Sequence, residues 1–338
     1  KYRLYCYYIH FMKIINISGG LGNQMFQYAF ARMLQQMHLD RGEQEQILII
    51  NKYIDTHTDQ GNEARQLSLN HLSLHPLTSI MPFEEQNRAL SRFKIIALIS
   101  SGIRECFRWR ILKQYNSTDA LMHRRGKWGM YYPYGPYPFH PITLSNRREK
   151  YIFGFFQNFK YVQPLALALK EELLVKTPAS APNQQYIEEI GQCNAICLHI
   201  RRGDYLNPRW KNLQICDFEY YNKAINHILN HTEAPVFFVF SNTHEDLEWI
   251  KINYKFYDTN NKQREIKLRF VDLGNPDYEE LRLMYSCKHF IISNSTFSWW
   301  AAWLGRHPEK IVVAPERWNL EYDNDTNIYD PSWHKIPR

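Results

Sequence analysis

The second half of the chain alternates between short apolar runs and segments with helical periodicity, and this pattern limits the possible folds more than any other feature. The expected strands span 195–199, 235–241, 268–271, 289–293 and 310–314, and the expected helices span 218–230, 245–253, 278–286 and 296–304. Alternation of this kind predicts a parallel sheet with helices packed on its faces, which is the α/β class.

The first half begins in the same way and then becomes harder to interpret. A strand at 13–17, a helix at 23–39 and a strand at 47–50 are expected, and the signals from 55 to 148 are weak. A strand at 151–156 and a helix at 162–175 precede TPASAP at 177–182, which resembles a linker. Because 338 residues suffice for two domains, we place one domain at 12–176 and a second at 183–338.

A charged segment, His199–Tyr205 (HIRRGDY), follows the first apolar run of the second domain. Ligands of open α/β sheets bind just outside the carboxyl ends of strands, and guanidinium groups suit a phosphorylated ligand because their forks match phosphate oxygens. Alternation along an extended chain places His199 and Arg201 on one face and Arg202 on the other. We therefore expect Arg201 to face the ligand, while Arg202 holds the loop or a neighbouring carboxylate.

Two other interpretations of this segment stay open. The arginines can form a structural ion pair, or residues 202–204 can be an RGD adhesion motif. The adhesion motif requires exposure of these residues, whereas a ligand site places them in a cleft.

A second strand end carries hydroxyl groups in the sequence SNSTFSWWAAWL at 293–304. Ser295 or Thr296 can cap the helix that follows, and the free N–H groups and dipole of that helix would face an anion. The three tryptophans on this helix are expected mainly in the core. A third strand end, Ser18–Gly22, lacks the spacing of dinucleotide and P-loop motifs. It either brings backbone amides close to a ligand or is a tight turn with Asn23 as the helix N-cap.

Charge and composition exclude several classes of function. A net charge of +7 fits an anionic ligand, or loose attraction to an acidic membrane, better than a nucleic-acid binder. The sequence contains no run of eighteen or more apolar residues, which a membrane-spanning helix would need. The six scattered cysteines are typical of reduced thiols in a cytosolic protein. Asp323–Asp325 has the Asp-x-Asp spacing of some divalent-ion sites, but it lies in a polar stretch and is expected to be a solvated turn.

The aromatic stretch Lys1–Phe11 precedes Met12 and lacks the features of a signal peptide. We interpret it as an over-extended gene start or a non-native leader, with a membrane-interface anchor as the alternative.

Four motifs together resemble the α-1,2-fucosyltransferases of glycosyltransferase family 11. They are GGLGNQMFQYAFAR at 19–32, HIRRGDY at 199–205, FFVFSN at 237–242 and SNSTFSWWAAWL at 293–304. Smaller matches at 217–225 and 287–291 agree in order and spacing, so the resemblance covers Met12 to about Trp318. The sequence departs from the family at Asn242, where many members have an aspartate.

The resemblance implies a GT-B-like fold of two Rossmann-type halves, with the donor site in the C-terminal half and the acceptor side in the N-terminal half. It implies inverting, metal-independent transfer of L-fucose from GDP-β-L-fucose to the 2-hydroxyl of a terminal galactoside, without any other cofactor. The acceptor would be a galactose-terminated glycan or glycolipid, such as an O-antigen. A nucleic-acid partner is not implied. A related glycosyltransferase with another linkage or donor is the alternative.

The resemblance also assigns residues to the site. Arg201 would hold the donor β-phosphate. The donor pocket would include Arg202, Asp204, Ser295 and Thr296, and the turn with Gly20, Gly22 and Asn23 would face the reaction centre.

Departure of GDP leaves negative charge that an arginine and helix N–H groups can stabilise. Asp204 and His199 are the nearest candidates for a base, Asn23 could orient the acceptor hydroxyl, and the reaction can also proceed without a strong base. The lack of an anchor in the sequence favours a cytoplasmic enzyme, and a peripheral contact with the inner membrane is left open.

Overall fold

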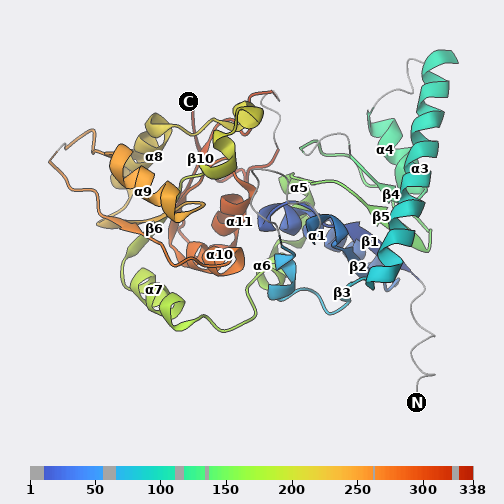
Figure 1. Ribbon diagram of the computed structural model, residues 1–338, viewed down its shortest axis with the longest axis horizontal. Helices are drawn as coiled ribbons and strands as arrows, with labels where there is room; N and C mark the ends of the chain where they lie inside the picture. The colour runs from blue at the N-terminus through green and yellow to red at the C-terminus, as the bar shows by residue number, and fades with distance from the viewer. Residues whose placement is uncertain are drawn as a thin grey trace. The chain divides into compact units, whose positions relative to one another are not determined.

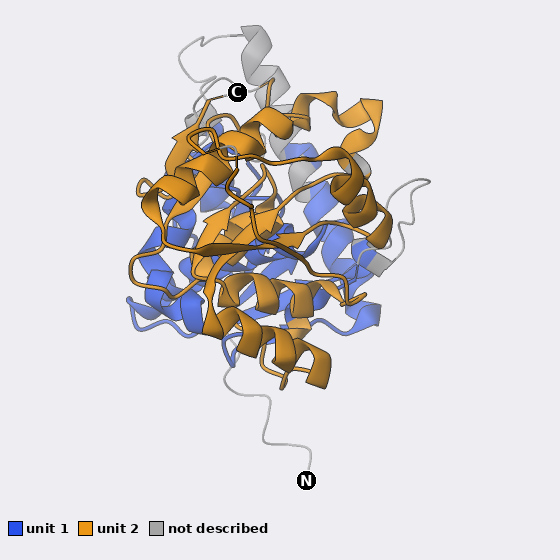
Figure 2. Cartoon of the chain, turned by 90° about the vertical axis from the view of Figure 1, so that its left-hand side faces the viewer, with its two compact units in different colours: residues 1–59, 63–69, 74–172 blue, residues 60–62, 70–73, 173–338 orange. Residues whose placement is uncertain are grey.

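The computed structural model describes residues 11–55, 66–110, 118–133, 137–261, 263–321 and 327–337. The chain divides into two compact units, shown in blue and orange in Figure 2. The first unit extends to Glu172, except for residues 60–62 and 70–73, which group with residues 173–338 in the second. The stretch 1–10 and the Asp-x-Asp turn at 323–325 lie outside the described residues. None of the described helices combines the length and the apolar composition needed to cross a membrane.

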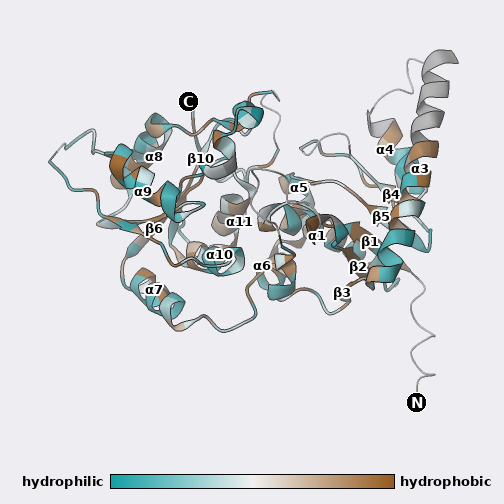
Figure 3. Ribbon diagram, viewed as in Figure 1, coloured by the Kyte–Doolittle hydropathy of each residue, from teal (hydrophilic) through white to brown (hydrophobic). Residues whose placement is uncertain are grey.

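The first unit is built on a five-stranded parallel sheet with the order β3-β2-β1-β5-β4 (Figure 1). Its strands are β1 (Met12–Asn16), β2 (Gln46–Ile50), β3 (Thr78–Ile80), β4 (Met130–Tyr131) and β5 (Glu149–Ile152). β1 lies at the centre, with the chain continuing outward on one side to β3 and returning on the other side to β5. The ribbon of β1 and β2 is brown over much of its length in Figure 3, which marks their residues as hydrophobic.

The described part of the first unit also contains helices. They are α1 (Leu21–Leu39), α2 (Lys52–Asp55), α3 (Phe83–Arg110), α4 (Thr118–Lys127), α5 (Phe159–Val162) and α6 (Ala166–Glu172), with 3-10 turns η1 (Ser68–His71), which ends in the second unit, and η3 (Gln163–Leu165). In α1, Phe30 is buried and stacks on Phe156 with ring centroids 3.8 Å apart. α1 begins at Leu21 with Gly20 as its N-cap, so the expectation that Asn23 caps the helix is wrong.

Two expectations for the end of the first unit also need correction. The strand expected at 151–156 ends at Ile152, because Gly154 and Phe156 have positive φ values (143° and 51°) that an extended strand does not allow. The single helix expected at 162–175 is divided by the 3-10 turn η3, because Pro164 cannot donate a backbone hydrogen bond there. Leu169 and Leu173 are buried.

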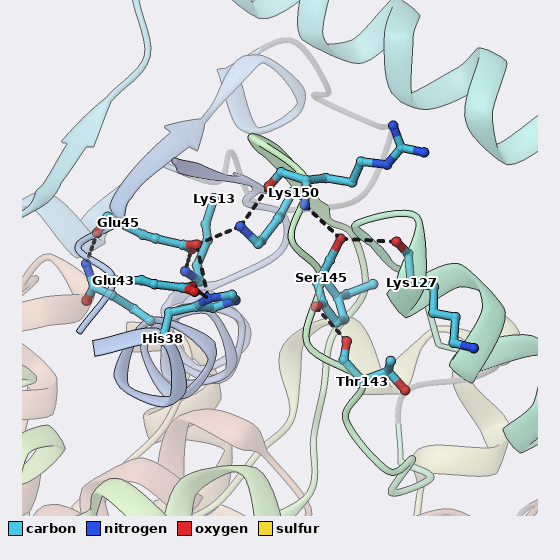
Figure 4. A network of polar contacts seen from close by, with 11 residues as sticks. Lys13, His38, Glu43, Glu45, Lys127, Thr143, Ser145 and Lys150 are labelled. Carbon is cyan, nitrogen blue, oxygen red and sulfur yellow. Dashed lines mark hydrogen bonds and ion pairs between the residues drawn. The ribbon is translucent and has the colours of Figure 1, made fainter. Parts of the chain in front are cut away.

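A buried cluster of charged side chains lies at the amino ends of the first sheet (Figure 4). Lys13 of β1 and Lys150 of β5 are register partners, and both form ion pairs with Glu45. His38 at the end of α1 lies 2.6 Å from Glu43 and 3.3 Å from Glu45. Lys13, Lys150 and Glu45 are almost completely inaccessible, so these ion pairs are removed from water.

The second unit contains a six-stranded parallel sheet with the order β11-β10-β9-β6-β7-β8. Its strands are β6 (Asn194–His199), β7 (Pro235–Phe240), β8 (Leu268–Phe270), β9 (His289–Ile291), β10 (Val312–Pro315) and β11 (His334–Ile336). From β8 to β11 the strands are therefore the third, second, first, fourth, fifth and sixth of the unit, the order of a Rossmann fold. The expected α/β class with two parallel-sheet halves is confirmed.

The helices of the second unit alternate with its strands. They are α7 (Ala181–Gln192), α8 (Phe218–His231), α9 (His244–Asn253), α10 (Asp277–Ser286) and α11 (Thr296–Leu304), with 3-10 turns η4 (Gly203–Leu206) and η5 (Pro208–Leu213). The sequence analysis missed α7 and β11. The other elements agree with expectation to within a few residues.

The core of the second unit lies between the sheet and α8, where Tyr220, Tyr221 and Ile225 pack on Phe237 and Ile291. On α11 the three tryptophans are buried, which confirms their expected place in the core, and Trp299 donates its indole N–H to the carbonyl of Ile328 at 2.7 Å. The described cysteines Cys193, Cys197, Cys216 and Cys287 are free thiols, as expected.

Candidate donor site at a sheet switch point

The charged segment and the hydroxyl-rich turn lie next to each other in the second unit. β6 and β9 are neighbouring parallel strands, with Leu198 opposite Ile291, so their carboxyl ends reach the same edge of the sheet. The chain leaves β6 toward β7 on one side, and it returns to β9 on the other. Such a topological switch point is where open α/β sheets bind ligands.

Hydrogen bonds join the two strand ends. The ring Nδ1 of His199 lies 3.0 Å from the Oγ of Ser293, and Tyr205 donates its hydroxyl to the carbonyl oxygen of Asn294 at 3.0 Å. The Asn294 amide in turn donates to the carbonyls of Leu213 and Trp318. The edge of the sheet is therefore a connected structure, in which the loop after β6 and the turn after β9 hold each other.

His199 is buried, with only 2 % of its surface exposed. Burial, with a smaller contribution from the charge of Arg201, lowers the pKa of His199 to about 3. The ring is consequently neutral near pH 7 and only weakly basic, and its hydrogen bond to Ser293 fixes its orientation. The assignment of His199 as a base stays a prediction. Its contact with Ser293 links the ends of β6 and β9.

Arg201 and Arg202 differ in their surroundings. The Arg202 guanidinium lies 3.3 Å above the ring centroid of Trp249, and its Nε is 3.2 Å from Asp246. Arg201 lies half-buried next to His199, with its guanidinium carbon 5.3 Å from the ring centroid of Tyr205. Arg202 therefore binds a neighbouring carboxylate, which is one of the two roles that the sequence analysis expected for it.

The turn after β9 leads directly into α11. Ser295 is the N-cap residue in extended conformation, and its side chain makes no capping hydrogen bond. The helix starts at Thr296, so its first N–H groups and the positive end of its dipole are at the carboxyl edge of the sheet. Side-chain capping by Ser295 is thus absent, and the binding of an anion at this helix end stays a prediction.

The first unit has a switch point of its own, and the predicted site residues of this unit lie at it. β1 and β5 are neighbours at which the strand order reverses, and the turn with Gly20, Gly22 and Asn23 follows β1. Gln157, which follows β5, donates its amide to the Oδ1 of Asn23 at 2.8 Å. The sequence analysis missed Gln157. Its place shortly after a predicted strand was the available signal.

Gln24 has a structural role in this turn. Its amide nitrogen donates to the carbonyls of Gly19 and Gln66, and its oxygen accepts the N–H of Ser68. Gly19 has a φ of 76°, and an added Cβ would lie 2.6 Å from the Asn23 amide nitrogen. Close packing against Asn23 therefore requires glycine at this position.

Asp204 lies in η4, but its side chain is outside the described part of the structure. Its roles as base or pocket residue, and the exposure of the 202–204 tripeptide as a whole, stay predictions.

Among the described residues, two groups have the composition of a cation site, and neither includes the predicted donor residues. His38, Glu43 and Glu45 share their surroundings with Lys13 and Lys150, which supply positive charge from the chain itself. His244, Glu248 and Asp272 lie near the start of α9 on a solvent-accessible surface.

The sequence model described as "Glycosyl transferase family 11" matches residues 12–337. The chain belongs to this family. It is therefore a glycosyltransferase, which confirms the resemblance inferred from the four motifs.

Several curated relatives are similar to this family 11 enzyme. The O-antigen biosynthesis glycosyltransferase WbnK of Escherichia coli is 28% identical over 94% of this chain and 98% of its own. An alpha-1,2-colitosyltransferase of Escherichia coli is 26% identical over 96% and 99% of the two chains. Human galactoside alpha-(1,2)-fucosyltransferase 1 is 34% identical over a shorter region, 32% of this chain and 28% of its own.

Among solved structures, fucosyltransferase NodZ from Bradyrhizobium is similar with a TM-score of 0.48 and 10% identity, over 86% of this chain and 92% of that chain.

Proposed function

We propose that this family 11 enzyme transfers a 6-deoxyhexose, L-fucose in the first instance, from its GDP-linked form to the 2-hydroxyl of a terminal galactoside. The relatives that align over nearly the whole chain are named for O-antigen synthesis and for α-1,2 transfer, which supports a surface-glycan acceptor. We place the reaction in the cytoplasm, with a peripheral contact at the inner membrane as a further part of the proposal.

The observation that carries the proposal is the convergence of Arg201 and the amino end of α11 at one switch point. Both provide positive electrostatic potential without a metal ion, Arg201 as a full charge and α11 through the dipole at its amino end. A sugar diphosphate develops its negative charge on the β-phosphate as it leaves. This arrangement suits stabilisation of that charge in the transition state.

In the proposed reaction the acceptor 2-hydroxyl attacks the anomeric carbon on the side opposite to the diphosphate, with inversion. The bond between that carbon and the β-phosphate oxygen breaks, the electron pair leaves with GDP, and the hydroxyl proton passes to a base or to solvent. Arg201 would hold the β-phosphate, and Asn23, oriented by Gln157, would hydrogen-bond the acceptor. Asp204 is the proposed base. His199 would hold the ends of β6 and β9 together through its contact with Ser293.

Colitose is a second candidate donor sugar, because the colitosyltransferase aligns over 96% of this chain. Purified enzyme should be incubated with GDP-fucose, GDP-colitose, GDP-mannose and UDP-galactose, each with β-galactoside acceptors and with EDTA present. We expect product with a GDP-linked 6-deoxyhexose and an α-1,2 linkage by NMR. Transfer only from UDP-galactose or GDP-mannose, or only after a divalent ion is restored, would contradict the proposal.

A further inference from the structure

We propose that Asp246, in the first turn of α9, is a positioning residue that holds the loop carrying Arg201 in the orientation needed for the donor diphosphate. The inference rests on the proposed function, because it assigns Arg201 to the same diphosphate. Sequence analysis did not identify Asp246, which lies more than forty residues from the loop it contacts.

The Asp246 carboxylate binds two consecutive residues of the loop. One oxygen accepts from the Nε of Arg202 at 3.2 Å, and the other accepts the backbone N–H of Gly203 at 3.1 Å. Its side chain is only 11 % exposed, so these charge-assisted bonds are partly shielded from water. Asp246 is fixed in turn by the start of its helix, because its N–H donates to the hydroxyl of Thr243 at 3.2 Å.

The segment between β7 and α9 holds both chain neighbours of Arg201. Ile200 donates its N–H to the carbonyl of Phe240 at 2.9 Å and accepts the hydroxyl of Ser241 at 2.8 Å. The N–H of Arg202 donates to the side-chain oxygen of Asn242 at 3.3 Å. Backbone contacts on both sides of Arg201 therefore determine the direction in which its side chain leaves the loop.

The loop after β6 packs closely against the segment before α9 at Gly203. Its φ is 43°, in the left-handed region, and an added Cβ would lie 2.9 Å from the amide nitrogen of Asn242. The loop can approach α9 closely because this residue has no side chain. Asn242 therefore contributes packing and a hydrogen-bond acceptor, and the carboxylate in this part of the fold comes from Asp246.

Trp249, one helical turn after Asp246, completes the contact. The Arg202 guanidinium lies over its ring, and such cation–π contacts favour arginine over lysine because the planar group stacks. Arg202 is thus held against α9 by a carboxylate and an aromatic face. Since successive side chains of an extended chain point to opposite faces, this placement of Arg202 leaves Arg201 to face the other side.

The test compares Asp246→Ala and Asp246→Asn with Glu248→Gln, each made in the unmodified enzyme and in an Arg201→Lys background. Glu248 is the matched control, since it lies on the same helix and pairs with the exposed Lys251. A displacement of about 1 Å at a catalytic group can cost roughly 10²-fold in rate. We expect a loss of that order in kcat/KM for Asp246→Ala, a smaller loss for Asp246→Asn, which keeps one acceptor, and little change for the control.

The double variants separate positioning from general destabilisation. If Asp246 acts through Arg201, the loss caused by Asp246→Ala will be much smaller in the Arg201→Lys background, because the interaction it supports is already impaired. Losses that multiply in the two backgrounds, or normal activity of Asp246→Ala, would overturn the inference.

Hydrogen exchange of the 200–206 backbone gives a readout that does not need activity. Faster exchange of the Gly203 amide is expected in Asp246→Ala, with a smaller increase in Asp246→Asn and none in the control, and unchanged exchange in Asp246→Ala would also overturn the inference. GDP binding to the unmodified enzyme, measured by calorimetry, is the separate check on the proposed function. Its absence would refute that function, whereas normal GDP binding with multiplicative losses refutes the positioning role alone.

Discussion

Replacing Glu45 by glutamine should destabilise the first unit more than any exposed charge substitution does. Glu45 is the buried counter-charge shared by Lys13 and Lys150, and glutamine keeps its shape while removing the charge. Removing one partner of a buried ion pair costs about 3–5 kcal/mol, since the remaining charge is left without compensation. At roughly 2–4 °C per kcal/mol for domains of this size, the melting temperature measured below pH 6, where both lysines are charged, should fall by about 6–20 °C.

The pH dependence of this loss identifies its cause. Burial lowers the pKa of Lys13 to about 6 and of Lys150 to about 8, from 10.5. Between those values and 10.5 the unfolded chain binds more protons than the folded chain, so stability rises with pH across this window. The Glu45→Gln loss should be largest below pH 6, where both lysines are protonated, and should shrink toward pH 10.

Denaturant unfolding at several pH values, followed by circular dichroism, measures both effects. Glu149→Gln is the control, because Glu149 pairs with Arg92 at an exposed site, where ion pairs contribute no more than about 1 kcal/mol. A Glu45→Gln loss as small as that of the control, or one that does not change between pH 6 and pH 10, would refute the role of Glu45 as the shared counter-ion.

The remaining predictions concern the edge of the second sheet at which β6 and β9 end. Arg201→Ala should lower kcat by about 10²–10³-fold, the usual effect of removing one stabilising donor from a transition state, and should weaken GDP binding in calorimetry; near-normal turnover would exclude the assigned role. Gly203→Ala should reduce kcat/KM and melting temperature together, because the new Cβ meets Asn242 at a left-handed φ; an unchanged enzyme would show that the loop is not held closely. Because the pKa of His199 is lowered to about 3 from 6.5, the folded state binds fewer protons and stability should rise with pH between these values. His199→Gln should flatten that rise in urea titrations, and it should not remove a limb near pH 6.5 from the rate profile.

The sequence predicted where β6 and β9 end, because that part of the fold is determined by local patterns. The apolar runs that form β6 and β9 stop at polar residues, and a parallel sheet brings such strand ends to one edge. Alternation along the chain also separated Arg201 from Arg202 before any contact was known. These inferences need only the period of a strand and the class of the fold.

The parts that sequence reasoning missed depend on contacts between distant residues or on backbone geometry. Asp246 belongs to a helix whose own pattern does not indicate that its first turn reaches Gly203. Gly20 is the N-cap of α1 through its backbone conformation, without a side-chain signal. The shared counter-ion role of Glu45 requires the register of β1 with β5, which pairs residues separated by more than 130 positions.

The placement of β6 beside β9 has a consequence for the order of folding. β6 can pair with β7 after about forty residues of chain, but β9 begins only at His289. Closing such a long loop is entropically costly, and contacts between distant segments slow folding. The contact between His199 and Ser293 spans 94 positions, so this edge of the sheet is complete only once β9 has paired with β6.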